Sequence, residues 1–188
     1  MKRARLLEYV VLIGLAVLVA LALQAWVVKP YRIPSGSMLD TLRPGDRVLV
    51  NRFVYHLHEP RRGDVIVFRY PGDPSVAFIK RVVGVPGDVL EARDGRLYVN
   101  GSPMREPYVH RTRGRRDPTT PAAALAGGTM HDPWSLSRAF TVPDGQFFVM
   151  GDNRLDSDDS RVWGTVPRDA IIGEGVATYW PFSRLHTL

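Results

Sequence analysis

An uncharged apolar run near the amino terminus constrains this chain more than any other feature. The stretch Tyr9–Val28 contains no Asp, Glu, Lys or Arg. At about 1.5 Å per residue, twenty helical residues cover roughly the 30 Å hydrocarbon core of a bilayer. Basic residues flank the run on both sides, and Pro30 follows it. We therefore predict a single N-terminal transmembrane helix over residues 9–28, a short tail over residues 1–8 and a folded domain over residues 29–188.

A cleavable signal peptide is the alternative interpretation of this run. Ala20-Leu21-Ala22 resembles a small-residue cleavage site. However, the apolar stretch is longer than the roughly 7–15 residues of a signal-peptide core, and Leu23–Val28 stays largely apolar beyond the supposed cut. A retained helix is therefore favoured. Its orientation is not decided by the positive-inside rule, because Lys and Arg lie close to both of its ends.

The rest of the chain is predicted to be mainly β. Short runs rich in β-branched and aromatic residues alternate with turn residues, and no long amphipathic helical pattern follows the apolar run. The strand candidates are Arg47–Phe53, Asp64–Tyr70, Phe78–Val85, Arg96–Val99, Gln146–Met150 and Ile171–Tyr179. The turns are Pro44-Gly45-Asp46, Pro71-Gly72-Asp73, Pro86-Gly87-Asp88, Asp94-Gly95 and Asn100-Gly101. This pattern indicates an antiparallel sheet or barrel.

Cysteine content and charge exclude several classes of function. The chain of 188 residues contains no cysteine, which excludes disulfides, iron–sulfur clusters, thiolate zinc sites and cysteine nucleophiles. The net charge of +6 leaves anionic partners open. Nearly all of the 25 cationic residues are arginine, and the lysines are Lys2, Lys29 and Lys80. Lys80 is thus the one lysine away from the flanks of the apolar run.

An arginine-, proline-, alanine- and glycine-rich stretch, Arg105–Arg138, interrupts the β pattern. We interpret it first as a solvated insertion or flap between strands. Its arginine cluster consists of Arg111, Arg113, Arg115 and Arg116. Contact of this cluster with anionic lipid headgroups is the functional alternative, because the chain is already tied to a bilayer. Nucleic acid is disfavoured as a partner, since basic residues without a recognisable binding fold are weak evidence.

Two serines follow the apolar run in Ile33-Pro34-Ser35-Gly36-Ser37-Met38. A catalytic serine needs its Oγ on a sharply bent loop, and the glycine between Ser35 and Ser37 permits such a bend. A serine-rich linker leaving the membrane is the simpler interpretation of these residues alone. A serine nucleophile also needs a base, and the histidines do not form a convincing triad with it. The histidines are His56, His58, His110, His131 and His186.

Lys80 is the candidate base. Strand alternation places Phe78, Lys80 and Val82 on one face, so the amine is predicted to be partly desolvated. Desolvation disfavours the ammonium and lowers the pKa, whereas at the reference pKa of about 10.4 only a few lysines in ten thousand are neutral at pH 7. An edge-strand lysine reaching to water is the alternative. Arginine elsewhere in this body supplies the solubilising cations, and arginine cannot act as a base.

The polar loop Gly151–Arg161 follows a strand candidate and is dense in carboxylates. It has a superficial likeness to a calcium loop, but the glycine, the terminal glutamate and the flanking helices of an EF-hand are missing. We therefore interpret it as a support loop for an active site, held in shape by Asp–Arg pairs.

Together these motifs resemble those of a type I signal peptidase, a membrane-bound serine protease with a Ser/Lys dyad. The matching motifs, in order, are Ser35–Met38, Arg61–Val67, Lys80–Gly84 and Gly151–Arg161 with Trp163-Gly164. The resemblance implies that Ser37 is the nucleophile and Lys80 its general base. It implies an oxyanion hole made by the Ser35 hydroxyl and the Ser37 backbone N–H, and a Ser157 that hydrogen-bonds and orients the lysine amine. The residues expected to brace the site are Asp152, Arg154, Asp159 and Arg161.

The resemblance also implies a fold, a reaction and a location. The domain would be an antiparallel β-sheet catalytic domain of the signal-peptidase type, with a variable insertion at about 105–138. It would remove N-terminal signal peptides from exported preproteins after small residues at −1 and −3. The expected partners are preprotein signal peptides and the lipid bilayer, without nucleic acid, cofactor or metal. The catalytic domain would lie on the extracytoplasmic side of the cell membrane, which makes residues 1–8 a cytoplasmic tail.

Two positions depart from the family pattern, and two other functions stay open. Family members usually have proline near position 40 and an Asp-Asn pair at 155–156, where this chain has Asp40 and Leu155-Asp156. These changes bear on loop shape and substrate preference. One rival function is a protease with the same dyad that matures another class of exported protein, such as pilins. The other is a non-catalytic, membrane-tethered module that binds anionic lipid or polymer through the arginine cluster.

Overall fold

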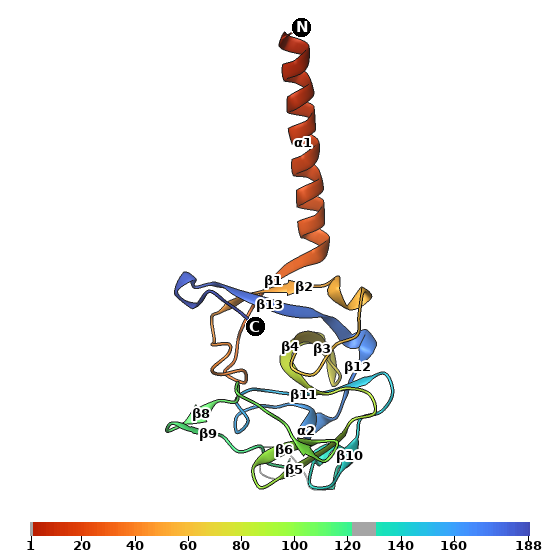
Figure 1. The fold of residues 1–188 in the computed structure, drawn as a ribbon, viewed down its shortest axis with the longest axis vertical. Helices are drawn as coiled ribbons and strands as arrows, with labels where there is room; N and C mark the ends of the chain where they lie inside the picture. The colour runs from red at the N-terminus through yellow and green to blue at the C-terminus, as the bar shows by residue number, and fades with distance from the viewer. Residues whose placement is uncertain (1, 122–130) are drawn as a thin grey trace.

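The computed structural model describes residues 2–121 and 131–188 (Figure 1). Within the first helix it describes the side chains of residues 8–21 and 27. Residues 122–130 of the predicted insertion lie outside the described residues.

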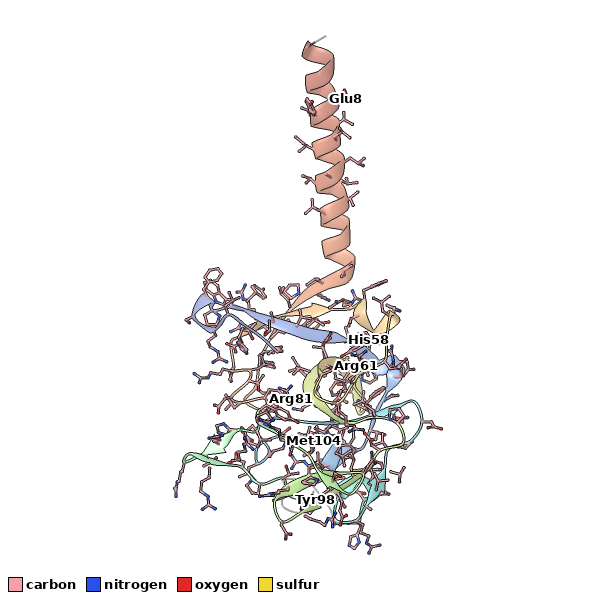
Figure 2. All side chains as sticks on the ribbon, viewed as in Figure 1. Glu8, His58, Arg61, Arg81, Tyr98 and Met104 are labelled. Carbon is pink, nitrogen blue, oxygen red and sulfur yellow. The ribbon has the colours of Figure 1, made fainter. Side chains whose placement is uncertain are left out.

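The N-terminal helix α1 spans Lys2–Val27. Its 26 residues rise about 39 Å at 1.5 Å each. The side chains from Glu8 to Leu21 are all exposed, and Figures 1 and 2 show the helix projecting away from the β body. Among the residues that the structure describes, no helix combines the length and the hydropathy of a membrane span. The transmembrane helix over residues 9–28 therefore stays a prediction.

The main sheet contains eight strands, and all of its pairings are antiparallel. Its order is β1-β2-β13-β3-β4-β11-β12, with β14 paired to β13. The strands are β1 Val28–Arg32, β2 Arg47–Asn51, β3 Val65–Tyr70, β4 Asp73–Gly84, β11 Gln146–Met150, β12 Val166–Pro167, β13 Ile171–Trp180 and β14 His186–Thr187. Strand β4 pairs with β3 on one side, but on the other side it pairs with β11 only from Arg81 onward. Its stretch from Val76 to Lys80 therefore has a free edge within the described residues.

A second sheet and a small hairpin complete the β body. The second sheet has the order β10-β5-β6-β7, and β8 pairs with β9. These strands are β5 Val89–Arg93, β6 Arg96–Val99, β7 Ser102–Pro103, β8 Arg111–Thr112, β9 Arg115–Arg116 and β10 Phe140–Thr141. The short helices are η1 Val54–His56, η3 Pro133–Ser135, α2 Ser160–Trp163, η4 Arg168–Ala170 and η5 Phe182–Arg184. Figure 1 shows the second sheet and the β8–β9 hairpin in the half of the body that is remote from α1.

Three buried apolar clusters hold the sheets together. One contains Val83 and Phe148 from the main sheet with Leu90 and Leu97 from the second sheet, so it joins the two. The second lies under the loop that follows β1 and contains Ile33, Met38, Leu42 and side chains of β2 and β3. The third is aromatic-rich and includes Phe68 and Phe147. Burial of this much apolar surface is the main stabilising contribution to the fold.

The prediction of a mainly β, antiparallel domain is confirmed. Strands β6 and β11 have the predicted bounds. The helix ends at Val27 rather than Val28, because Val28 already pairs with Asn51 in β1–β2. Strand β4 begins at Asp73, five residues earlier than predicted, because β3 and β4 continue as a hairpin beyond Phe78.

Candidate active site

Ser37 and Lys80, 43 residues apart in the chain, meet at the centre of the site. The distance from Lys80 Nζ to Ser37 Oγ is 2.6 Å, which is a hydrogen-bond distance. Both side chains are largely shielded from solvent, with exposed fractions of 9% for Ser37 and 4% for Lys80. An amine and a hydroxyl in direct contact, away from bulk water, form a possible base–nucleophile pair.

The loop after β1 positions Ser37 by packing on both of its sides. Ile33 precedes the serine while Met38 and Leu42 follow it, and all three side chains are buried in the core beneath the loop. Asn153 of the support loop binds this loop through two hydrogen bonds. Its backbone N–H donates to the Ser37 carbonyl at 3.1 Å, and its side-chain amide donates to the Gly36 carbonyl at 3.1 Å. The serine is therefore fixed between the apolar core and the support loop.

Strand β4 positions Lys80 next to an aromatic ring. Nζ lies 5.6 Å from the centroid of the Phe78 ring, as the strand alternation predicts. Burial lowers the pKa of the Lys80 amine, although the negative charges of Asp159, Asp158 and Asp152 act in the opposite direction. The net shift favours the neutral amine, which is the protonation state of a general base.

Two further serines lie beside the pair. The hydroxyls of Ser35 and Ser37 are 3.5 Å apart, and Ser35 is exposed to the cleft described below. The buried Ser157 Oγ makes no hydrogen bond to any described residue. The predicted bond from Ser157 to the Lys80 amine is thus not formed in this structure, in which Nζ contacts Ser37 Oγ instead.

Gly151 explains why the support loop can approach Ser37 so closely. A Cβ atom at this position would lie 2.3 Å from the Ser37 carbonyl oxygen and 2.3 Å from Ser157 Oγ. Any larger residue would therefore push the support loop away from Ser37.

A bidentate ion pair joins the support loop to β4. Arg81, the residue after the candidate base, donates from Nε and Nη2 to the Asp152 carboxylate at 2.9 and 2.7 Å. Its Nη1 donates to the Gly63 carbonyl, and Thr41 Oγ1 donates to Asp152 as well. The guanidinium also stacks 4.1 Å from the Tyr108 ring. Figure 2 labels Arg81 within the body, and its hydrogen bonds to Asp152 and Thr41 link β4 to the support loop and to the loop after β1, here called the serine loop.

Asp159 and Arg161 form a second buried pair within the support loop. Arg161 donates to both oxygens of Asp159 at 2.9 Å, and Asp159 also accepts from the backbone N–H groups of Gly151 and Arg161. Burial alone would raise the pKa of Asp159, but the Arg161 charge holds it below its ordinary value. Arginine therefore neutralises both buried carboxylates of the loop. In the described part of the chain, no group of three His, Asp or Glu residues is arranged to hold a metal ion.

Arg154 anchors the predicted insertion to the support loop. Its fully buried guanidinium donates to Glu106 Oε1 at 2.5 Å, to Thr119 Oγ1 at 2.5 Å and to the Gly151 carbonyl at 2.9 Å. Burial by itself would lower the pKa of Arg154, but the Glu106 carboxylate outweighs this effect and raises it. Glu106 and Thr119 are both buried. Their contacts place the insertion against the support loop.

Other contacts between the insertion and the site point the same way. The His110 backbone N–H donates to the Asp152 carbonyl at 2.8 Å, and Arg161 donates to the Thr120 carbonyl at 3.2 Å. His110 Nδ1 lies 3.0 Å from the carboxylate of Asp40, the residue that stands where the family usually has proline. The interpretation of this stretch as a solvated flap is therefore wrong for the buried residues Glu106, Val109, Asp117 and Thr119, whereas residues 111–116 of the β8–β9 hairpin are exposed, as that interpretation expects.

A cleft of about 370 Å³ opens beside Ser37 and Lys80. One wall is the extended segment from Tyr31 to Ser37, and the other is the free edge of β4 from Val76 to Lys80. The remaining lining residues are Val67 and, from the support loop, Asp156 and Asp158. An extended peptide could add to the free edge of β4 and bring one of its carbonyl groups to Ser37.

Sequence reasoning missed the residues that tie the site together. Four residues without an assigned role in the predicted site hold its loops in place: Arg81, Asn153, Glu106 and Tyr108. Each of them contacts the loop that carries Ser37, the support loop, or a residue bound to one of these loops. Arg81 lies directly beside Lys80 in a matched motif, which was a usable signal. Glu106 and Tyr108 lie in the predicted insertion, whose sequence contains no signal that they support the site.

Comparison with known proteins gives a consistent family. Residues 6–180 match the model of the family described as signal peptidase, peptidase S26. The chain is 39% identical over 191 residues to signal peptidase I of Leptolyngbya laminosa, covering 97% of this chain and 84% of that protein. It is 39% identical over 207 residues to signal peptidase I of Pseudomonas fluorescens, covering 90% and 72%. It is 34% identical over 181 residues to signal peptidase I T of Bacillus subtilis, covering 95% and 88%.

A solved structure is also similar in part. The signal peptidase I of Enterococcus faecalis is 32% identical, with a TM-score of 0.47, and the match covers 62% of this chain and 97% of that one. The family match and the identities over nearly the whole chain agree with the resemblance carried by the four motifs. The chain therefore belongs to the signal peptidase family S26, the serine peptidases that remove signal peptides.

Proposed function

We propose that this protein is a membrane-anchored serine endopeptidase in which Ser37 is the nucleophile and Lys80 the general base, and that it releases exported preproteins from their signal peptides. The observation that carries the proposal is the 2.6 Å contact between Lys80 Nζ and Ser37 Oγ, both of them buried at the wall of the cleft. A lysine in such a site can be neutral near pH 7 and can take the serine proton.

The proposed reaction has two stages. Neutral Lys80 removes the proton of Ser37 as Oγ attacks the scissile carbonyl, and the oxyanion is held by the Ser35 hydroxyl and the Ser37 backbone N–H. Each such donor stabilises the transition state by about 3–4 kcal/mol in related sites. The protonated Lys80 then gives its proton to the leaving amine, which leaves an acyl-enzyme. A water molecule activated by the same amine hydrolyses this ester.

The cleft supports an extended substrate with small side chains near the scissile bond. The free edge of β4 offers backbone N–H and C=O groups to an added strand, and the apolar walls exclude water from it. A preference for small residues at −1 and −3 is implied by membership of the family. Ser37 ends one wall and Lys80 ends the other, so a peptide bound along the cleft would reach Ser37 Oγ with its scissile carbonyl.

A membrane anchor is part of the proposal. The Tyr9–Val28 run carries no formal charge, and the described apolar side chains from Tyr9 to Leu21 are exposed. Large exposed aromatic side chains, those of Phe53, Trp180 and Phe182, lie on the segments that follow β2 and end β13, in the half of the body from which α1 projects (Figure 1). An anchored enzyme meets its substrate at high effective concentration, because the signal peptide lies in the same bilayer. The catalytic body would then be extracytoplasmic.

Lipid contact through Arg111, Arg113, Arg115 and Arg116 gains no support from this arrangement. Figure 1 shows β8 and β9 in the half of the body that is remote from α1. With α1 in a bilayer, this half of the body would lie on the side away from the membrane.

The purified full chain in detergent, mixed with a preprotein, tests the proposed function. We expect one cleavage, after a small residue at the end of the signal peptide, with the new amino terminus identified by mass spectrometry. A matched preparation of Ser37→Ala controls for contaminating proteases. Absence of cleavage in the wild type, or equal cleavage by both preparations, would contradict the proposal.

The pH dependence of kcat/KM gives a separate test of the base. Because burial lowers the pKa of Lys80, activity should rise as that amine deprotonates, below the range in which a free lysine titrates at about 10.4. The sign follows from the mechanism, since the neutral amine is the active form. A rise confined to pH 10 and above would show that Lys80 is not the desolvated base.

A further inference from the structure

Asp158 is a carboxylate in the substrate cleft that the proposed mechanism does not use. It lines the cleft together with Ser37 and Lys80. The two other carboxylates whose charges act on Lys80 are occupied, because Asp152 pairs with Arg81 and Asp159 with Arg161. Among residues 2–121 and 131–188, no residue donates a hydrogen bond to the Asp158 side chain or forms an ion pair with it. Its charge is therefore available to a ligand in the cleft.

The surroundings of Asp158 make that charge effective. Burial raises the pKa of its carboxyl above the ordinary value, while the Lys80 charge lowers it and the Asp159 charge raises it. The side chain is nonetheless exposed, so its charge is open to solvent as well as to a ligand in the cleft. The interaction with Lys80 is reciprocal, because Asp158 also raises the pKa of the amine. Arg32, the remaining cation of the cleft lining, is not among the groups that shift the pKa of Asp158.

The rest of the cleft makes a charged group here unusual. Both walls are mostly apolar, and the charged residues that line the cleft besides Asp158 are Asp156, Arg32 and Lys80, so a substrate charge facing Asp158 has few other charges near it. An acidic substrate side chain next to Asp158 would be repelled by the carboxylate and would also lose hydration. A basic side chain there would form an ion pair with Asp158.

We propose that Asp158 is a specificity-determining residue, which selects against preproteins with an acidic side chain facing it beside the scissile bond and in favour of those with a basic one. This inference rests on the proposed function and narrows its substrate class. It concerns a position other than −1 and −3, which are held by small side chains.

A charge series in the substrate tests the proposal. Peptides with small residues at −1 and −3 would carry Lys, Gln or Glu at −2, +1 or +2, and kcat/KM would be measured for each. At one of these positions we expect the wild type to prefer Lys to Glu by about fivefold, with Gln between them. Asp158→Asn should bring this ratio close to one, and Asp158→Lys should reverse it.

Asp144→Asn is the matched control. It removes the same negative charge from an exposed turn that does not line the cleft, so the wild-type preference should persist. The inference is overturned if the wild type shows no charge preference at any position, or if Asp158→Asn and Asp158→Lys keep the wild-type ratio. If the wild type cleaves none of the peptides, including the Gln series, the proposed function itself fails, so the two failures are distinguishable.

A pH profile with a Gln peptide gives a second readout that simple loss of packing would not produce. The groups whose charges act on Lys80 are Asp159, Asp158, Arg161 and Asp152. Removing the Asp158 charge removes an influence that raises the pKa of Lys80, so the acid limb of the profile should move to lower pH. Asp144→Asn should leave the limb in place. An unmoved limb in Asp158→Asn would show that this charge does not reach the dyad.

Discussion

Replacing Lys80 with alanine is expected to lower kcat for preprotein cleavage by roughly 10⁴- to 10⁶-fold. Nζ is 2.6 Å from Ser37 Oγ, and no other described base lies within hydrogen-bond distance of that oxygen. Without the amine, the serine proton has no acceptor and the leaving group has no acid. The oxyanion donors and the cleft stay in place, so a small residual rate over the uncatalysed reaction should remain.

Two companion variants separate chemistry from folding. Lys80→Arg keeps a cation at the position but cannot deprotonate, so it should be as inactive as Lys80→Ala. Lys80→Met fills the same volume without a polar group, and it should fold at least as stably as the wild type because it removes the cost of burying the amine. Circular dichroism and thermal unfolding of Lys80→Met provide the check on the fold.

The double variant tests whether the two residues act as a unit. Ser37→Ala alone should lose about as much activity as Lys80→Ala, and combining the two should cost little more, because either change already abolishes the same step. Additive losses, or near-normal turnover of Lys80→Ala, would disprove the dyad.

Much of this site follows from local sequence, because local patterns determine local geometry. The alternation in Phe78–Val82 placed the amine next to an aromatic ring, and the ring is where the pattern predicts it. The scarcity of lysine singled out Lys80 before any contact was known. The Ser35-Gly36-Ser37 bend and the carboxylate-rich loop are equally short-range features.

The parts that sequence reasoning missed depend on long-range pairing. Arg81 and Asp152 are 71 residues apart, and Arg154 and Glu106 are 48 apart. Spacing and periodicity carry no information about such partners, which are brought together only by the order of strands in the sheet. The prediction that Asp–Arg pairs hold the loop therefore identified the carboxylates and the arginines, but it did not identify which arginine pairs with which carboxylate. Composition also misled, since Glu106 and Tyr108 lie among arginines and prolines that indicated a solvated stretch.

The second large effect that we predict is a loss of stability on changing a residue of the insertion. Glu106→Ala is expected to lower the free energy of unfolding by about 3–5 kcal/mol, because it leaves the fully buried Arg154 guanidinium without its counter-charge. Urea unfolding of the full chain in detergent, followed by tryptophan fluorescence, measures this change. Glu106→Gln should cost less, since its amide oxygen can still accept the hydrogen bond from Arg154.

Glu91→Ala is the matched control for this stability prediction. Glu91 also pairs with an arginine, Arg93, but at 3.3 Å and on the surface, where such a pair contributes about 0–1 kcal/mol. The contrast isolates burial, because each variant removes one carboxylate from one arginine. Equal, small losses in the free energy of unfolding of both variants would show that Arg154 binds water or another partner in place of Glu106. The insertion would then not stabilise the support loop through this ion pair.

The same Glu106 variants decide whether the insertion serves catalysis as well as stability. Arg154 also donates to the Gly151 carbonyl, and Gly151 lies against the Ser37 carbonyl, so a shift of Arg154 is passed to the nucleophile through two contacts. Under conditions where Glu106→Ala is still folded, kcat should fall more than KM rises, because the cleft walls are untouched while the serine is displaced from Lys80. Glu106→Gln should restore most of kcat, whereas a fall in stability with unchanged kcat would limit this ion pair to holding the fold.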